Sequence, residues 1–162
     1  MSGSLESLAS CASLEIINVD GCRRLKGDLR FAASLSALRE LNISETECGG
    51  SLQPLATCAK LTRLSLRYCA VDGQIEPLAN CAALEQIDCS HASNLTGSIE
   101  PLAQLPRLET LVLFSCLKVE GDVGCLSACK RLASLNVAQC KRITGAESFA
   151  RDRGSSCEVR FD

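Results

Sequence analysis

Aliphatic residues recur along this chain inside a short phrase that is written six times. The phrase reads Leu-x-x-Leu-x-Leu, with Ile, Val or Cys replacing a later leucine in some copies. Side chains of an extended strand point alternately to its two faces, so this spacing predicts a short strand with one buried face. The copies open at Leu14, Leu38, Leu61, Leu84, Leu108 and Leu132. The pattern therefore predicts six similar strands that recur every 23 or 24 residues.

Glycines recur with the same spacing, and an aliphatic residue stands two positions after most of them. Glycine relieves the backbone in a tight turn. Pro54, Pro77 and Pro101 occupy equivalent places a few residues further on. Proline is tolerated at the first position of a helix, because its missing N–H would have no helical partner there. We therefore predict a turn and a short helical segment after each strand. The glycines are Gly3, Gly27, Gly50, Gly73, Gly97, Gly121 and Gly145.

Units of this length cannot bury their own apolar face, so they must stack on one another. We predict a right-handed α/β solenoid with one parallel β-sheet on its concave face and with turns and short helices on its convex face. The register places four leucines inside and two neighbours outside. Leu64, Leu66, Leu111 and Leu113 are expected to be buried, whereas Ser65 and Val112 are expected to point outward.

Residues 1–162 are predicted to form a single domain of about six repeats, each 23–24 residues long, with a closing strand around residues 158–161. Residues 3–8 match the second half of a repeat whose strand is missing, so we expect a fragment of a longer protein. Solenoid ends need a cover over their last apolar layer. Residues 151–162 are expected to provide a modest one at the C-terminal end.

The full repeat is clearest in its third copy, which reads Leu61-x-x-Leu64-x-Leu66-x-x-Cys69-x-Val71-x-Gly73-x-Ile75. This phrase resembles the leucine-rich-repeat family across essentially the whole chain. Its Gly-x-Ile/Leu ending is similar to the plant-type subclass. The cysteine at the ninth place, and a second one in Ala-x-Cys-x-x-Leu, are similar to the cysteine-containing subclass, which is common in F-box substrate receptors. The resemblance implies a solenoid that recognises other proteins.

Twelve cysteines are present, and eight occupy two repeat positions. Four take the ninth place of the phrase and four precede its first leucine by three residues; they are Cys22, Cys69, Cys116 and Cys140, and Cys11, Cys58, Cys81 and Cys129. Free cysteine packs as a small apolar residue, so we expect stacked, buried and unbridged thiols. Such thiols are typical of a reducing compartment and indicate an intracellular, cytoplasmic protein. The alternative is a zinc site at Cys125 and Cys129, but no matching second pair or histidine accompanies them.

Catalytic signatures are weak, and we expect no enzyme activity, no cofactor and no metal. The one histidine, His91, could lie near Cys69 as a nucleophile–base pair, but the repeat turns that thiol inward. A net charge of −2 argues against nucleic acid or an anionic membrane as partner. No apolar run is long enough to span a membrane.

The outward positions of the phrase are its second, third, fifth, seventh and eighth residues. Four of the six copies place mostly polar side chains there, such as Asn42 and Ser44 or Asp88 and Ser90, whereas the fifth copy offers Val112 and Phe114 to solvent. Aromatic residues and arginines dominate interface hot spots. The alternative is a tolerated exposed pair of apolar side chains. The predicted partner-binding residues are Arg63, Arg67, Tyr68, Asp88, His91, Val112 and Phe114.

Three functions therefore stay open. The first is a protein–protein interaction module or scaffold that binds another protein on its concave face. The second is a structural spacer within a larger intracellular protein, and the third is the substrate-recognition part of a ubiquitin ligase. The sequence does not name the partner or the oligomeric state.

Overall fold

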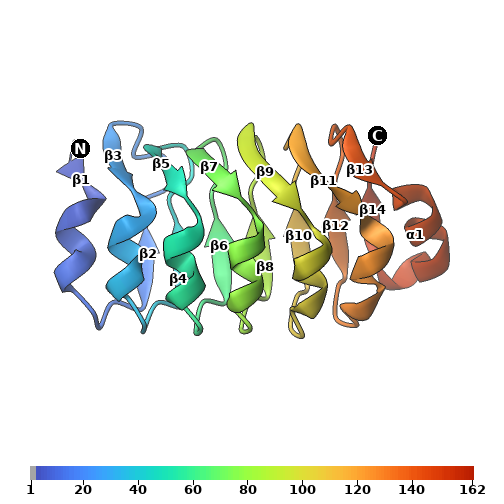
Figure 1. Ribbon diagram of the computed structural model, residues 1–162, viewed down its shortest axis with the longest axis horizontal. Helices are drawn as coiled ribbons and strands as arrows, with labels where there is room; N and C mark the ends of the chain where they lie inside the picture. The colour runs from blue at the N-terminus through green and yellow to red at the C-terminus, as the bar shows by residue number, and fades with distance from the viewer. Residues whose placement is uncertain (1–2) are drawn as a thin grey trace.

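The computed structural model describes residues 3–162 as a row of stacked coils. Figure 1 shows the coils side by side from the N-terminal to the C-terminal end, with short helices along one side. Each coil contributes a strand to each of two seven-stranded sheets. Neighbouring strands in both sheets pair in parallel. The α/β leucine-rich-repeat solenoid predicted from the sequence is confirmed.

The concave sheet is built from the Leu-x-Leu segments. Its strands are β2 (Ile16–Asn18), β4 (Glu40–Asn42), β6 (Arg63–Ser65), β8 (Gln86–Asp88), β10 (Thr110–Val112), β12 (Ser134–Asn136) and β14 (Glu158–Arg160). The central residue of each strand pairs with its equivalent in the next coil, as Leu64 does with Ile87 and Ile87 with Leu111. Leu64, Ile87 and Leu111 are buried, as are Leu66 and Leu113. Ser65 and Val112, which each lie between two leucines of the phrase, are half-exposed. The predicted register is therefore confirmed, and each buried leucine contributes about 1.5–3 kcal/mol.

A second sheet runs through the segments where the sequence predicted only turns. Its strands are β1 (Gly3–Ser4), β3 (Leu25–Asp28), β5 (Glu47–Ser51), β7 (Ala70–Gln74), β9 (Asn94–Ser98), β11 (Lys118–Asp122) and β13 (Arg142–Thr144). The prediction of one sheet is thus corrected to two. Period-two patterning did not reveal this sheet, because its strands mix glycine and charged residues with a single buried aliphatic, such as Val71 or Val119.

The repeated glycines lie in or beside this second sheet, and from Gly27 onward residues of the preceding coil pack against them. Gly50 and Gly145 have left-handed backbones, with φ of 84° and 78°. A Cβ added to Gly50 would come within 2.9 Å of the Asp28 Cβ, and one added to Gly145 would overlap the Asp122 carboxylate. Both aspartates cap a short helix by accepting from the backbone N–H two residues on. The glycine spacing therefore leaves room for the previous coil's capping side chain.

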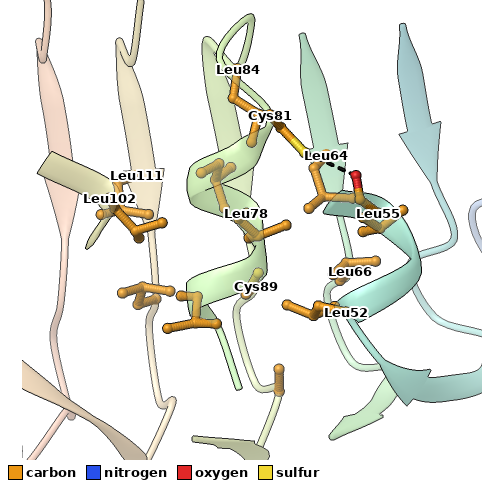
Figure 2. Packing of buried hydrophobic residues seen from close by; sticks show 14 of the residues in the cluster. Leu52, Leu55, Leu64, Leu66, Leu78, Cys81, Leu84, Cys89, Leu102 and Leu111 are labelled. Carbon is orange, nitrogen blue, oxygen red and sulfur yellow. Dashed lines mark hydrogen bonds between the residues drawn. The ribbon is translucent and has the colours of Figure 1, made fainter. Parts of the chain in front are cut away.

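Short 3₁₀ helices connect the second sheet back to the concave sheet. They are η1 (Leu5–Ser10), η2 (Leu29–Ser34), η3 (Gln53–Thr57), η4 (Glu76–Asn80), η5 (Glu100–Gln104) and η6 (Val123–Ala128). Each buries at least one apolar residue, such as Leu55, Leu78 or Leu102, between the two sheets. Pro54, Pro77 and Pro101 stand within the first two positions of their helices, as the sequence predicted. Figure 2 shows Leu55, Leu78 and Leu102 among the packed leucines of the core.

The C-terminal end is covered by the helix α1 (Ala146–Arg153), which is followed by η7 (Gly154–Ser156) and β14. Phe149 on α1 is only 4% exposed. The Arg153 Nη2 atom donates to the Leu132 carbonyl at 2.6 Å, and its guanidinium lies 5.7 Å from the Phe149 ring centre. This cover begins at Ala146, five residues before the segment that the sequence predicted, because Phe149 supplies its apolar contact.

Candidate functional site

Three aromatic side chains form a ladder across three neighbouring coils. The Tyr68 and His91 rings are stacked, with centres 4.1 Å apart and an angle of 14° between their planes. Phe114 presents its ring to His91 at 81°, with centres 4.9 Å apart. Tyr68 and His91 follow β6 and β8, and Phe114 follows β10, so all three lie where strands of the concave sheet end. Each ring pair of this kind contributes about 0.5–1.5 kcal/mol beyond burial.

The eighth residue of every phrase has a left-handed backbone. Five of these positions carry a side chain and one is glycine: Gly21, Glu45, Tyr68, His91, Ser115 and Gln139, with φ between 52° and 71°. This conformation costs about 1–3 kcal/mol for a residue other than glycine. Tyr68 and His91 therefore occupy a strained position, where their stacking offsets part of the cost. Their exposure differs: 55% of Tyr68 is exposed, whereas His91 is half-buried between its two neighbours.

Val112 and Phe114 lie on the outward side of the fifth coil, as expected, but neither is fully exposed. Both are half-buried. The His91 ring covers part of Phe114, and the His91 backbone N–H donates to the Phe114 carbonyl at 2.8 Å. The apolar patch is therefore continuous with the aromatic ladder. The sequence indicated Tyr68, His91 and Phe114 by residue type, but it could not predict the contact between their rings, because neighbouring members of the ladder are 23 residues apart in the chain.

Arg67 spans several coils of the concave sheet. Its guanidinium nitrogens lie 3.9 Å from a carboxylate oxygen of Asp20, two coils away, and 3.9 Å from one of Asp88, in the next coil. Arg63 is the first residue of β6, whereas Arg67 follows that strand, and Arg63 donates to the Glu40 carboxylate at 2.7 Å. The structure thus joins Arg67 and Asp88 to the ladder region and leaves Arg63 in a separate ion pair.

Side chains at the fifth position of the phrase hold the turn that follows each strand. The oxygens of Asn18, Asn42, Asp88 and Asn136 accept from the backbone N–H two residues on, at 2.9–3.2 Å. These polar side chains are therefore structural. The sequence pattern predicted only that these side chains point outward, although Asn and Asp side chains commonly hydrogen-bond the backbone two residues on in turns.

Two serines that we expected on the outward face are buried. Ser44 is fully buried and its hydroxyl lies 2.8 Å from that of Ser65. Ser90 is 8% exposed and donates to Asp88 at 2.5 Å. Their small side chains bond to neighbours within the sheet, and the longer Arg67 side chain passes from Asp88 to Asp20 across the coil that carries Ser44. The expectation that Ser44 and Ser90 meet solvent was wrong for this reason.

Carboxylates outnumber cations at the outward positions of the six phrases. The carboxylates are Glu15, Asp20, Glu40, Glu45, Glu85, Asp88 and Glu109, and the cations are Arg39, Arg63 and Arg67. All three arginines already face a carboxylate, since Arg39 pairs with Glu15 at 3.2 Å in addition to the pairs above. The outward side of the concave sheet is therefore acidic. A hollow of about 330 Å³ runs along it, lined in part by Arg63, Gln86, Asp88 and Val112.

Buried thiols form two rows that hydrogen-bond from coil to coil. At the ninth position, Cys69, Cys116 and Cys140 each donate to a carbonyl of the preceding coil at 2.8–3.0 Å. Before the first leucine, Cys81 donates to the Leu55 carbonyl at 3.1 Å, which Figure 2 marks with a dashed line. Burial raises the pKa of the Cys81 and Cys116 thiols to about 12.

The first coil departs from the expected burial of cysteine. Cys11 is exposed and Cys22 is only partly buried, because no coil within residues 3–162 packs on their N-terminal side.

Catalytic and metal chemistry find little support in the side chains. Burial raises the pKa of the Cys69 thiol, and its sulfur faces the Ile43 carbonyl, so it is not activated as a nucleophile beside His91. Cys125 and Cys129 gather no further ligand: within residues 3–162, no three His, Cys, Asp or Glu side chains come together as a metal site. None of the helices in that range combines the length and apolar character that crossing a membrane requires.

Known proteins match this chain through their structures. No protein-family model matches it, and no curated protein matches it. An internalin (inlF) of Listeria monocytogenes aligns with a TM-score of 0.70 and 16% identity, covering 98% of this chain and 51% of the internalin. The LRR ectodomain of the membrane receptor kinase GASSHO1/SCHENGEN3 of Arabidopsis thaliana, in complex with CASPARIAN STRIP INTEGRITY FACTOR 2, aligns with a TM-score of 0.63 and 15% identity. That match covers 84% of this chain and 18% of the receptor chain.

A third similar structure also comes from Listeria monocytogenes. The functional domain of InlJ from Listeria monocytogenes, described as including a cysteine ladder, aligns with a TM-score of 0.62 and 21% identity. It covers 85% of this chain and 30% of the InlJ chain. This chain thus spans about half of the internalin inlF and less of the other two proteins. The similarity establishes the leucine-rich-repeat fold, in agreement with the two stacked parallel sheets.

Proposed function

We propose that this chain is a protein-interaction module that binds a partner protein on its concave sheet, around Val112 and Phe114. The observation that carries the proposal is the aromatic ladder of Tyr68, His91 and Phe114. It sets an apolar and aromatic strip across three coils on a face that is otherwise polar and acidic. In protein interfaces a few residues provide most of the binding energy, and tyrosine and arginine are among the types enriched there.

Further support comes from the fold and from the surroundings of the ladder. Solenoids present extended surfaces to partners, and the similar receptor ectodomain was solved in complex with CASPARIAN STRIP INTEGRITY FACTOR 2. Arg67 flanks the ladder, and Asp88 holds Arg67 from the neighbouring coil. Arg63 extends the surface along the sheet. The function requires no bond-making chemistry from the chain, in keeping with buried thiols that are not activated.

Phe114→Ala tests the proposal. Removing the ring takes away the centre of the strip, and we expect partner binding to weaken at least several-fold. Because Phe114 also packs against His91, we expect the free energy of unfolding to fall by about 1 kcal/mol, which leaves the chain folded. Arg67→Ala should weaken binding less, since its ion pairs are partly exposed.

The measurement is a quantitative pull-down from cell extract with the wild type and Phe114→Ala side by side. Phe161→Ala is the matched control, because Phe161 is 39% exposed and lies beyond β14, away from the ladder. The proposal predicts that captured proteins are lost with Phe114→Ala and retained with Phe161→Ala. Equal capture by all three proteins would leave the concave sheet without a binding role and would favour a structural spacer.

A further inference from the structure

A hollow of about 500 Å³ lies beside the exposed end of the aromatic ladder. It is lined by Arg23, Glu45, Thr46, Glu47 and Tyr68. Glu45 and Tyr68 are neighbours in the row of left-handed residues, and His91 follows Tyr68 in the next coil. One face of the Tyr68 ring stacks on His91, so the opposite face is turned toward the coil that carries Glu45. The hollow therefore combines an open aromatic face with two carboxylates.

The chain already places its own cations on these carboxylates. Arg23 donates to Glu45 at 2.9 Å, and Lys26 lies 3.2 Å from Glu47. The side chains of Arg23 and Lys26 are 80% and 70% exposed. Ion pairs between exposed side chains are weak and exchange readily for other partners. Arg23 lines the hollow and shows that a guanidinium fits there, and both cations can be displaced from their carboxylates.

We propose that the partner inserts an arginine or lysine of an extended segment into this hollow, between the open Tyr68 face and the Glu45 and Glu47 carboxylates. This inference rests on the proposed binding function of the concave sheet. The incoming cation displaces Arg23 from Glu45 and packs over the Tyr68 ring, where a cation within about 6 Å of the ring centre is attracted to it. Apolar residues of the same segment then reach His91, Phe114 and Val112.

Charge complementarity favours this class of partner over an acidic one. Carboxylates exceed cations at the outward positions of the sheet, and the three arginines there are already paired with carboxylates. An acidic segment would meet the Glu45 and Glu47 carboxylates that line the hollow. A basic segment gains attraction along the same path and binds faster at low salt.

The probe is a fluorescein-labelled short peptide in which leucine and arginine alternate. Its controls carry glutamine or glutamate in place of arginine, and binding to the whole chain is followed by fluorescence anisotropy. We expect the arginine peptide to bind, the glutamine peptide to bind several-fold more weakly and the glutamate peptide most weakly. No binding of the arginine peptide up to about 1 mM, or equal binding of all three peptides, would overturn the proposal.

Variants of the chain separate this hollow from general attraction between opposite charges. Glu45→Gln and Tyr68→Asn should each weaken the arginine peptide about threefold or more; asparagine is chosen because it tolerates the left-handed backbone. Arg23→Gln should strengthen it about twofold, because the internal competitor is gone.

The control pair is Glu120 and Arg142 on the second sheet, whose side chains lie 3.9 Å apart and are 58% and 60% exposed. Glu120→Gln and Arg142→Gln change the net charge by the same amounts as Glu45→Gln and Arg23→Gln. If the two pairs of variants shift binding equally, the hollow is not the site and the proposal fails.

The pull-down with Phe114→Ala keeps the two proposals distinguishable. Loss of partner by Phe114→Ala, together with no preference for arginine among the peptides, would retain the interaction function and reject the cation site. Peptide binding that depends on Glu45 and Tyr68 supports the cation site directly, through variants outside the Val112 and Phe114 patch.

Discussion

The first coil and the later coils of the solenoid bury equivalent apolar residues to different extents. In the first coil, Leu14 and Val19 are half-buried, whereas Leu84 and Cys89, at the same places in the fourth coil, are completely buried. At the other end, α1 lays Phe149 over the last coil and buries it. An apolar residue of the repeat therefore contributes more to the free energy of unfolding when a neighbouring coil or helix covers it on both sides. Solenoid stability is a sum of coil and nearest-neighbour terms, and the first coil has one neighbour among residues 3–162.

Leu84→Ala and Leu14→Ala test this contrast with the same substitution at the same repeat position. We expect Leu84→Ala to lower the free energy of unfolding by about 4 kcal/mol, because it leaves a cavity between two coils. Leu14→Ala should cost less than half as much, since water already reaches its side chain. Urea unfolding followed by circular dichroism measures both. Equal losses would show that the first coil is as well packed as the fourth.

Phe149→Ala tests the cover at the C-terminal end. Removing the ring exposes the last apolar layer and takes away the surface over which the Arg153 guanidinium lies. We expect a loss of about 3 kcal/mol in the free energy of unfolding. The control is Arg151→Ala, on the same helix but exposed, which should change stability by less than about 0.5 kcal/mol. If the control were as damaging, the helix itself rather than the buried ring would be responsible.

Alkaline pH should destabilise the interior coils through their thiols. Burial raises the pKa of Cys81 from 9.0 to about 12, so the unfolded chain releases this proton at lower pH than the folded chain. The thiol's contribution to stability is full below pH 9.0 and is lost as the pH rises toward 12. Cys81→Ala should therefore flatten the fall of stability across this range, and Cys11→Ala should leave it unchanged. Stability measured by urea unfolding between these pH values would decide it, and identical slopes in the two variants would contradict the assignment.

The rate at which each cysteine reacts with a thiol reagent reports the same difference in burial, residue by residue, with the smallest expected effect on stability. At neutral pH we expect Cys11 to react first with a thiol reagent and Cys22 next, while Cys81, Cys89 and Cys116 stay unmodified until the chain unfolds. Mass spectrometry of timed samples locates the modified cysteines. Early modification of Cys89 would mean that the fourth coil opens as easily as the first.

Much of the fold could be predicted because the repeat makes each residue's role recur. The burial of Leu64, Leu66, Leu111 and Leu113 followed from period-two alternation, and so did the outward direction of Ser65 and Val112. The second sheet was missed because its strands have no such alternation. Ser44 and Ser90 were expected to be exposed and are buried. Their burial depends on hydrogen-bond partners of their hydroxyls and on Arg67 in a neighbouring coil, which the repeat pattern does not indicate.

The candidate site was predictable as a set of residue types and not as an arrangement. Tyr68, His91 and Phe114 were selected one by one for their chemistry, and the structure joins them into one ladder. Which ring faces meet depends on the left-handed backbone after each strand, and a single sequence signals that conformation clearly only at Gly21. The hollow beside Tyr68 could not be predicted either, because its lining residues Arg23, Glu45 and Tyr68 come from three different coils.

The amino-acid sequence by itself determined the stacking of coils, the register of the concave strands and the inward direction of most thiols. These properties depend on spacing within one repeat, and hydrophobic burial enforces them at every coil. Only the tertiary structure showed the ring contacts, the reach of Arg67, the hydrogen bonds between thiols and carbonyls, and the contacts of Phe149 in the C-terminal cover. Those contacts join residues one or two coils apart, so their geometry depends on how neighbouring coils pack, which no single repeat encodes.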